Sequence, residues 1–265
     1  MKDLIITAAK GAVIGGTMLI PGVSGGSMAM MMGIYDKLIM AVSNFRKDMK
    51  RNFVFLLWFC IGAGLGMLII ARPLLHLLEV FPYPTQFFFI GAVIGCVPMI
   101  YNKAKLSGFS WHVPFYILIG MAVVALFSLA PSDGGQAASG GVTQIVFLLV
   151  AGVIAAAALV LPGISVSYLL LMLGLYDSTM AAISGLQIMF LLPLFIGLCA
   201  GIILTTKLLD NLMTNRPRAT YLIILGFMFA SVLEVFPGVP PLSQWIACIL
   251  CLAAGFSAIY FISRK

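Results

Sequence analysis

Long apolar stretches alternate with short polar ones along almost the whole chain. Most of these stretches approach the length of about 20 residues that a helix needs to cross a bilayer. We delimit ten of them, at residues 4–20, 27–42, 53–71, 87–101, 113–130, 142–161, 166–184, 188–206, 220–236 and 245–262. The pattern predicts an all-α integral membrane protein with multiple passes.

A polar stretch rich in glycine and serine, PSDGGQAASGG at residues 131–141, divides the ten segments five and five. Such composition is typical of a linker between structured units. We interpret residues 1–130 and 142–265 as two halves, and residues 131–141 as an external linker between them.

The two halves are similar in sequence. An offset of 141 residues, which becomes 135 after a six-residue deletion, brings many identical or similar residues into register. The aligned pairs include Pro21 with Pro162, Gly22 with Gly163, Ser24 with Ser165, Gly33 with Gly174, Tyr35 with Tyr176, Gly62 with Gly197, Gly66 with Gly201 and Arg72 with Lys207. So many matches in register indicate an internal duplication. Glycines four residues apart, as at 62 and 66 or 197 and 201, are typical of close helix packing.

Each half contains a Pro-Gly pair in the middle of apolar sequence. Proline removes a backbone donor and glycine adds conformational freedom, so the pair breaks a helix. A helix break in hydrocarbon leaves backbone N–H and C=O groups without hydrogen-bond partners, which costs free energy. A bound ligand can supply those partners. We therefore expect a re-entrant helical hairpin at about residues 4–42 and another at about 142–184, each followed by three transmembrane helices. Three spans are an odd number, so the second half begins on the opposite side of the membrane from the first. The two halves are therefore inverted-topology repeats.

The positive charges agree with this topology. When both termini are cytoplasmic, only Arg72 of the fifteen lysines and arginines falls on the outer side. The basic clusters at 46–51, 103–105 and 207–218 then all face the cytoplasm, as basic loops usually do. If all ten segments crossed the membrane, the cluster at 207–218 would face the opposite side from the other two.

Composition excludes several classes of protein. The chain is 62% hydrophobic and 9% charged, whereas soluble domains are about 25% charged. The net charge of +7 comes from residues at segment ends, where they act as topology signals and contact anionic lipid headgroups, so it does not predict binding to nucleic acid. All five cysteines lie in apolar runs and only two histidines are present, so we expect no metal site and no cofactor.

The duplicated motif predicts an anion-binding site. Free N–H groups at a helix start and serine hydroxyls can bind an anion, and glycines let it approach the backbone. Two inverted copies would bring two half-helix N-termini together near the bilayer midplane. The candidate binding residues of the two motifs are Pro21, Gly22, Ser24, Gly25, Gly26, Ser27, Pro162, Gly163, Ser165 and Ser167. An ordinary helix kink or a tight interhelical turn is the alternative interpretation.

Two basic residues extend the candidate site. Arg72 and Lys207 are equivalent in the two halves and are expected at opposite mouths of a pathway. Either they meet an anionic headgroup there, or they simply reach lipid phosphates at the interface.

Four acidic residues are candidates for proton coupling. Asp36 and Asp177 follow a tyrosine at equivalent places in both hairpins, where they carry protons, pair with Arg72 or Lys37, or only mark the polar ends of the hairpins. Glu79 and Glu234 are weaker candidates.

The sequences PGVSGGSMAMMMGIYDKLI and LPGIS…LGLYDS resemble the polyprenyl-phosphate translocase family of bacteria and archaea, and the resemblance covers essentially the whole chain. It implies a transporter of the bacterial cytoplasmic membrane that is not an enzyme. Its substrate would be undecaprenyl phosphate, the lipid carrier for cell-wall sugars, which it returns from the outer to the inner leaflet. The expected partners are this lipid and the surrounding membrane lipids, and a homo-oligomer is compatible with the sequence.

Two alternatives belong to different classes. Undecaprenyl-pyrophosphate phosphatases are similar in plan, but in that family an arginine follows the motif serine and glutamates assist it. Gly25 and Val166 stand at those positions here, so the transition-state cation is missing. A secondary transporter of a small anion would use the same site and would differ in lacking a groove open to lipid.

Overall fold

The computed structural model describes residues 2–18, 23–105, 111–129 and 141–263, and helices joined by turns make up these ranges. Six helical segments are long and apolar enough to cross a membrane, which confirms the prediction of an all-α, multi-pass membrane protein. The helices are α1 (Lys2–Thr17), α2 (Gly25–Met31), α3 (Tyr35–Ser43), α4 (Met49–Ile69), α5 (Ala71–Val80), α6 (Pro82–Lys103), α7 (His112–Leu129), α8 (Val142–Val160), α9 (Val166–Met172), α10 (Tyr176–Ser184), α11 (Ile188–Asn215), α12 (Pro217–Val235), η1 (Leu242–Gln244) and α13 (Trp245–Ser263).

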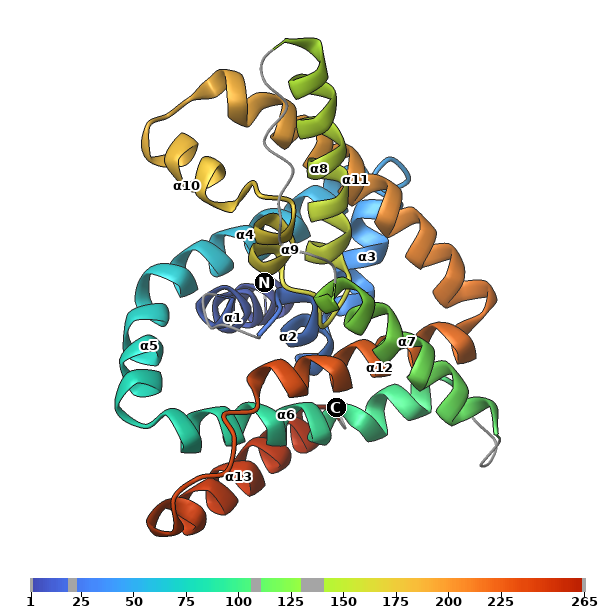
Figure 1. The fold of residues 1–265 in the computed structure, drawn as a ribbon. Helices are drawn as coiled ribbons and strands as arrows, with labels where there is room; N and C mark the ends of the chain where they lie inside the picture. The colour runs from blue at the N-terminus through green and yellow to red at the C-terminus, as the bar shows by residue number, and fades with distance from the viewer. Residues whose placement is uncertain (1, 19–22, 106–110, 130–140, 264–265) are drawn as a thin grey trace.

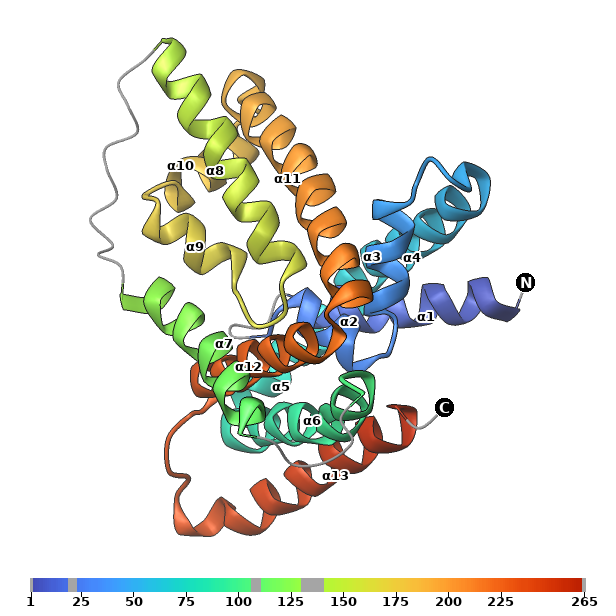
Figure 2. The same cartoon turned by 90° about the vertical axis from the view of Figure 1, so that its right-hand side faces the viewer.

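Four close helix pairs build the molecule (Figure 1). Helix α1 packs against α4, and α8 packs against α11, so each of these pairs lies within one half of the chain. Helix α6 packs against α13, and α7 packs against α12, so these pairs join the halves. Helices α6 and α12 also contact each other. Figure 2 shows the first turn of α1 and the last turn of α13 on one side of the molecule, and the end of α7 on the opposite side.

Glycines set the distance between the paired helices within each half. A Cβ placed on Gly62 would lie 2.0 Å from the carbonyl oxygen of Ala8, and one on Gly197 would lie 2.1 Å from that of Leu149. Ala8 and Leu149 are themselves equivalent at the offset of 141. The helix backbones therefore touch at the same positions in both halves, which confirms the predicted packing role of these glycines.

The same equivalence holds for the pairs that join the halves. A Cβ on Gly91 of α6 would lie 2.1 Å from the Leu252 carbonyl oxygen of α13. A Cβ on Gly226 of α12 would lie 2.2 Å from the Ile117 carbonyl oxygen of α7. Both the glycines and their partners are related by the offset of 135.

The second limb of each predicted hairpin is two helices rather than one. The breaks fall at Gly33 and Gly174, where φ is +64° and +66°. After Gly33, the Ile34 amide bonds the Ala29 carbonyl oxygen at 3.0 Å, and the Gly33 amide bonds that of Met30 at 2.9 Å. These two bonds form the glycine-dependent Schellman end of a helix, and the same pair of bonds recurs after Gly174.

The stretch 72–86 lies between two of the ten apolar segments, but most of it is helical. Helix α5 occupies residues 71–80, and α6 begins at Pro82. Leu74 and Leu78 lie one turn apart and pack against the central core, whereas Arg72 and Glu79 are exposed. The apolar stripe is narrow, which explains why this helix does not stand out as an apolar run.

The two hairpins are not packed alike. Buried residues of α2 and α3 belong to the largest hydrophobic cluster, together with residues of α6 and α12. Helix α9 contributes to a smaller cluster beside α7 and α12. In Figure 1, α10 lies at the edge of the molecule, while α2 and α3 are surrounded by other helices. The first hairpin is therefore part of the core, and the second lies against it.

Candidate functional site

The two Pro-Gly-x-Ser segments meet. The Gly163 amide donates a hydrogen bond of 2.9 Å to Oγ of Ser24, which joins residues 139 apart in the chain. Figure 2 shows the turn between α8 and α9 reaching α2 and α12 at the centre of the molecule. We call this contact between residues 23–27 and 161–165 the tip contact.

Ser24 is fully hydrogen-bonded within the tip contact. It is the N-cap of α2, because its Oγ accepts from the Ser27 amide at 3.1 Å. The same Oγ accepts from the Gly163 amide and donates to Oγ of Ser27 at 2.9 Å. One donated and two accepted bonds are all that a hydroxyl can make. The predicted capping role of Ser24 is thus confirmed, and its hydroxyl has no capacity left for a ligand in this conformation.

Glycine permits the close approach of the two tips. A Cβ on Gly26 would lie 3.0 Å from the Pro162 nitrogen. Gly163 has φ of +82°, and a Cβ there would lie 2.2 Å from the Phe227 carbonyl oxygen of α12. The sequence suggested that these glycines let a ligand approach the backbone. In this structure the space is occupied by the opposite tip and by α12.

Among the described residues, little free volume lies beside Ser27. A cavity of about 10 Å³ lies there, between α2, α6 and α12. This is room for a single water and not for a phosphate group. Ser27 is only 2% exposed, and Ser231 on the far wall donates to the Met228 carbonyl oxygen at 2.8 Å. The described residues around Ser27 therefore leave no space for a phosphate group.

The remaining motif residues differ in their surroundings where the structure describes them. Pro21 and Gly22 lie outside the described residues. Gly25 faces the side chain of Met18, 3.0 Å from the position of a Cβ. In the second motif, Ser165 is half-buried and Ser167 is exposed.

The two basic candidates are exposed. Arg72 lies in the first turn of α5, and Lys207 lies in the middle of α11. Neither forms an ion pair with another described residue. The structure does not bring them to the tip contact, so a role at the mouths of a pathway stays a prediction.

Of the acidic candidates, Asp36 has a defined partner. Its Oδ2 forms an ion pair with Nζ of Lys103 at 2.5 Å, and its Oδ1 is buried without a hydrogen-bond partner. The same Nζ lies 5.7 Å from the ring centroid of Tyr221. Asp36 therefore pairs with Lys103 of α6, and the predicted pairing with Arg72 or Lys37 was wrong for this residue. Asp177, Glu79 and Glu234 are exposed.

We expect Asp36→Asn to destabilise the protein by about 1–2 kcal/mol, because it leaves the half-buried Lys103 cation without its carboxylate. Asp177→Asn, at the equivalent and exposed position of the other half, should change stability by less than about 0.5 kcal/mol. Thermal unfolding of both variants in the same detergent measures the difference. Equal shifts would show that the ion pair contributes nothing.

Four residues whose side chains fix the first hairpin were not among the candidates. The Tyr35 hydroxyl donates to the Val160 carbonyl oxygen at the end of α8, at 3.0 Å. Asp210 of α11 accepts from Ser43 Oγ at 2.9 Å and from Asn44 Nδ2 at 2.7 Å. A lone acidic residue within an apolar helix is a signal that could have identified Asp210. Tyr35 aligned in the repeat, but nothing in the sequence indicated its partner.

Comparisons with known proteins agree on one family. The family model described as undecaprenyl phosphate translocase-like matches residues 14–247. A Staphylococcus aureus protein named polyprenyl-phosphate transporter is 33% identical, over 95% of this chain and 93% of that protein. A Vibrio cholerae protein of the same name is 26% identical, over 89% of this chain and 78% of that protein. No solved structure gives a significant match.

Proposed function

The chain belongs to the undecaprenyl phosphate translocase-like family, and from that premise we propose that it carries a polyprenyl phosphate, such as undecaprenyl phosphate, across the bacterial cytoplasmic membrane. The direction we propose is from the outer to the inner leaflet, which returns the carrier for cell-wall (peptidoglycan) synthesis. The observation that carries the mechanism is the hydrogen bond between Ser24 and Gly163 at the tip contact.

The main barrier to transport of this lipid is the charge of its phosphate group. Hydrocarbon about 30 Å thick separates the leaflets, and an ionised group cannot cross it without replacements for its hydration shell. The polyprenyl tail has no such barrier, because it is already soluble in lipid. A translocase for this lipid therefore needs donors for one anion at mid-membrane depth, and no chemical step.

The tip contact contains suitable donors, which are occupied in the closed state. If the tips part, the Gly163 amide loses its acceptor on Ser24. The Ser24 and Ser27 hydroxyls lie on the same tip and keep their mutual bond until a ligand competes for it. All three groups can donate to a phosphate oxygen that enters between the tips. Helix α2 has only seven residues, so we assign the binding to these individual donors and not to a helix dipole. The protein exchanges an internal bond for a bond to the ligand.

We propose the topology predicted from the sequence, with residues 1–130 and 142–265 as inverted repeats and one re-entrant hairpin in each. The contacts of Gly62 and Gly197, and of Gly91 and Gly226, are equivalent in pairs and support the duplication. The placement of the ends of α1, α13 and α7 in Figure 2 is compatible with cytoplasmic termini and an external linker. Inverted halves provide two related states, each open to one side.

The second hairpin is the better candidate for the moving part. The first is held to α8 by Tyr35, to α6 by Asp36 and to α11 through Asp210. Asp177, the counterpart of Asp36, is exposed and has no ion pair with another described residue. We propose that residues 161–184 move away from the fixed first tip when the phosphate enters.

The test is transport by purified protein in liposomes that contain a fluorescent polyprenyl phosphate. The fraction of probe that a membrane-impermeant quencher reaches reports its leaflet. Ser24→Ala should slow exchange by about 10- to 100-fold, because a hydrogen bond to a charged group is worth about 1.5–3 kcal/mol. Ser184→Ala is the matched control, since this exposed serine only bonds the Met180 carbonyl oxygen within α10.

Phosphate release from undecaprenyl pyrophosphate is measured on the same samples. We expect exchange without release. Release at a rate comparable to exchange would replace the proposal with the phosphatase alternative. Folded protein that exchanges no lipid but carries a small anion would support the third alternative.

A further inference from the structure

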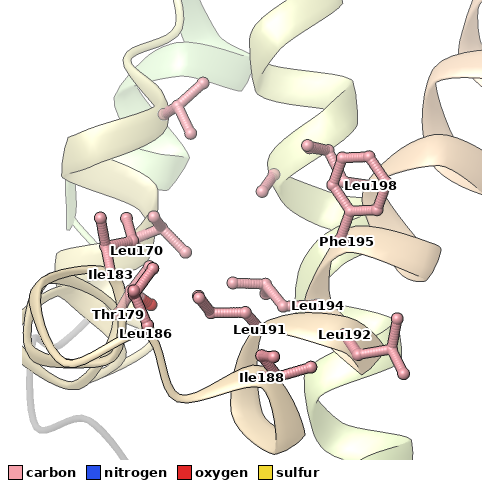
Figure 3. A pocket seen from close by; sticks show the side chains of 12 residues that line it. Leu170, Thr179, Ile183, Leu186, Ile188, Leu191, Leu192, Leu194, Phe195 and Leu198 are labelled. Carbon is pink, nitrogen blue, oxygen red and sulfur yellow. The ribbon is translucent and has the colours of Figure 1, made fainter.

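A large apolar cavity lies between α8, α9, α10 and α11 (Figure 3). Its volume is about 480 Å³, and its lining side chains are leucine, isoleucine, valine, alanine, phenylalanine and a single threonine. The outer rim is open, because Leu186, Ile188 and Phe195 are exposed. In a membrane-spanning protein such an opening faces hydrocarbon or the interface, and not bulk water.

The one polar lining residue carries an unused hydroxyl. Thr179 is 7% exposed, and its Oγ1 has no hydrogen-bond partner. A threonine on a helix usually bonds a carbonyl oxygen one turn back, and Thr206 does so to Ile202 at 2.7 Å. A buried hydroxyl without a partner costs free energy. Its place on the cavity wall indicates a ligand with a weak acceptor.

The cavity reaches the first turn of α9, which directly follows the second motif. Val166, the first residue of α9, lines the cavity and directly follows Ser165 of the second motif. Leu170, one turn further along, lines it as well. A lipid whose phosphate lies at the tips would therefore have the start of its tail beside Val166, at the end of the cavity nearest the second motif.

We propose that this cavity binds the isoprenoid tail next to the phosphate of the transported lipid. The proposal rests on the proposed function. Methyl-branched prenyl units suit a wide cavity between four helices. Their double bonds also offer the π acceptor that the Thr179 hydroxyl lacks, which a saturated acyl chain does not. The remainder of the tail stays in the bilayer.

The test uses undecaprenyl phosphate that carries a photoreactive diazirine within the first prenyl units. The probe is cross-linked to the wild-type protein in liposomes, and the labelled peptides are identified by mass spectrometry. We expect labelling of the cavity walls on α9, α10 and α11, and loss of that labelling when unlabelled undecaprenyl phosphate competes. A phosphatidylglycerol carrying the same group on an acyl chain should label these walls no more than other lipid-facing surfaces.

The outcomes separate the two proposals. Lipid exchange without labelling of the cavity would overturn the tail site and leave the translocase intact. Specific labelling without exchange would overturn the translocase and leave the tail site. Equal labelling by both lipids would show that the cavity holds ordinary acyl chains.

Filling the cavity gives a second measurement. Leu191→Trp should slow exchange of undecaprenyl phosphate about tenfold, which corresponds to about 1.4 kcal/mol, and should leave exchange of geranyl phosphate unchanged. Leu56→Trp is the control, because it makes the same change at the equivalent, similarly half-buried position of the first half. Thr179→Val should reduce the preference for undecaprenyl phosphate over its fully saturated analogue. Equal effects of both tryptophans, or slowing independent of tail length, would contradict the tail site.

Discussion

Gly163→Ala is expected to abolish exchange of polyprenyl phosphate, with a loss of at least about 100-fold, or about 2.7 kcal/mol. The new Cβ would lie 2.2 Å from the Phe227 carbonyl oxygen, and neither backbone can give way without displacing the tip. The Gly163 amide would then leave Ser24. Because this amide is one of the proposed phosphate donors, both the closed state and the bound state lose a contact.

Gly238→Ala separates this packing effect from backbone strain. Gly238 has φ of +88°, close to the +82° of Gly163, but nothing lies within 4 Å of its Cβ position. Both substitutions therefore cost about 1–2 kcal/mol for a left-handed conformation, and only Gly163→Ala also disturbs the tips. Exchange is measured after size exclusion and circular dichroism have shown that both variants are folded. Similar exchange by the two variants would mean that the tip contact has no part in transport.

Gly66→Ala is expected to destabilise the protein by about 3 kcal/mol or more, whereas Gly64→Ala on the same helix should be neutral or slightly stabilising. A Cβ on Gly66 would lie 1.9 Å from the Ala12 carbonyl oxygen of α1, and one on Gly64 would meet nothing within 4 Å. Helix α1 leads directly to the first tip, so separating it from α4 also displaces the site. Thermal unfolding in one detergent should show a difference of roughly 10 °C.

The duplication supplies an internal check on that result. Gly62→Ala and Gly197→Ala place a Cβ 2.0 and 2.1 Å from equivalent carbonyl oxygens, so they should lower the unfolding temperature by similar amounts. If Gly66→Ala unfolds at the temperature of Gly64→Ala, the close packing of α1 on α4 does not hold the structure together.

The features of the structure that depend only on residues near one another in the sequence could be predicted. Hydrophobic length identified the membrane-spanning helices, and the repeated glycines identified where backbones touch. The Pro-Gly pairs identified the chain breaks. Gly33 and Gly174 also aligned, but the sequence did not reveal that each ends a helix, because the apolar run continues through them. Helix α5 was missed because its narrow apolar stripe resembles a loop in composition.

The site was only partly predictable, because its geometry depends on how the halves meet. The sequence singled out both tips, and the Ser24 cap follows from local sequence. The bond from the Gly163 amide to Ser24 joins two segments that no local pattern relates. The same limit applies to Asp36, whose partner Lys103 lies 67 residues away. Arg72 and Lys207 were predicted from charge alone, and the structure leaves both exposed.

The central claim is that the phosphate binds between the two Pro-Gly-x-Ser tips. The chain contains three Pro-Gly dipeptides, at 21–22, 162–163 and 237–238. Labelling with carbonyl-13C proline and 15N glycine therefore isolates the amide signals of Gly22, Gly163 and Gly238 in solid-state NMR. The measurement is the loss of each signal through dipolar coupling to 31P of undecaprenyl phosphate, in bilayers whose other lipids contain no phosphorus.

We predict that coupling to 31P reduces the Gly163 signal, and that of Gly22 with it, while Gly238 in the loop between α12 and α13 is unaffected. Phosphatidylglycerol added at the same concentration in place of undecaprenyl phosphate serves as the control for non-specific contact. Bound lipid that leaves the Gly22 and Gly163 signals unchanged would place the phosphate elsewhere and contradict the account.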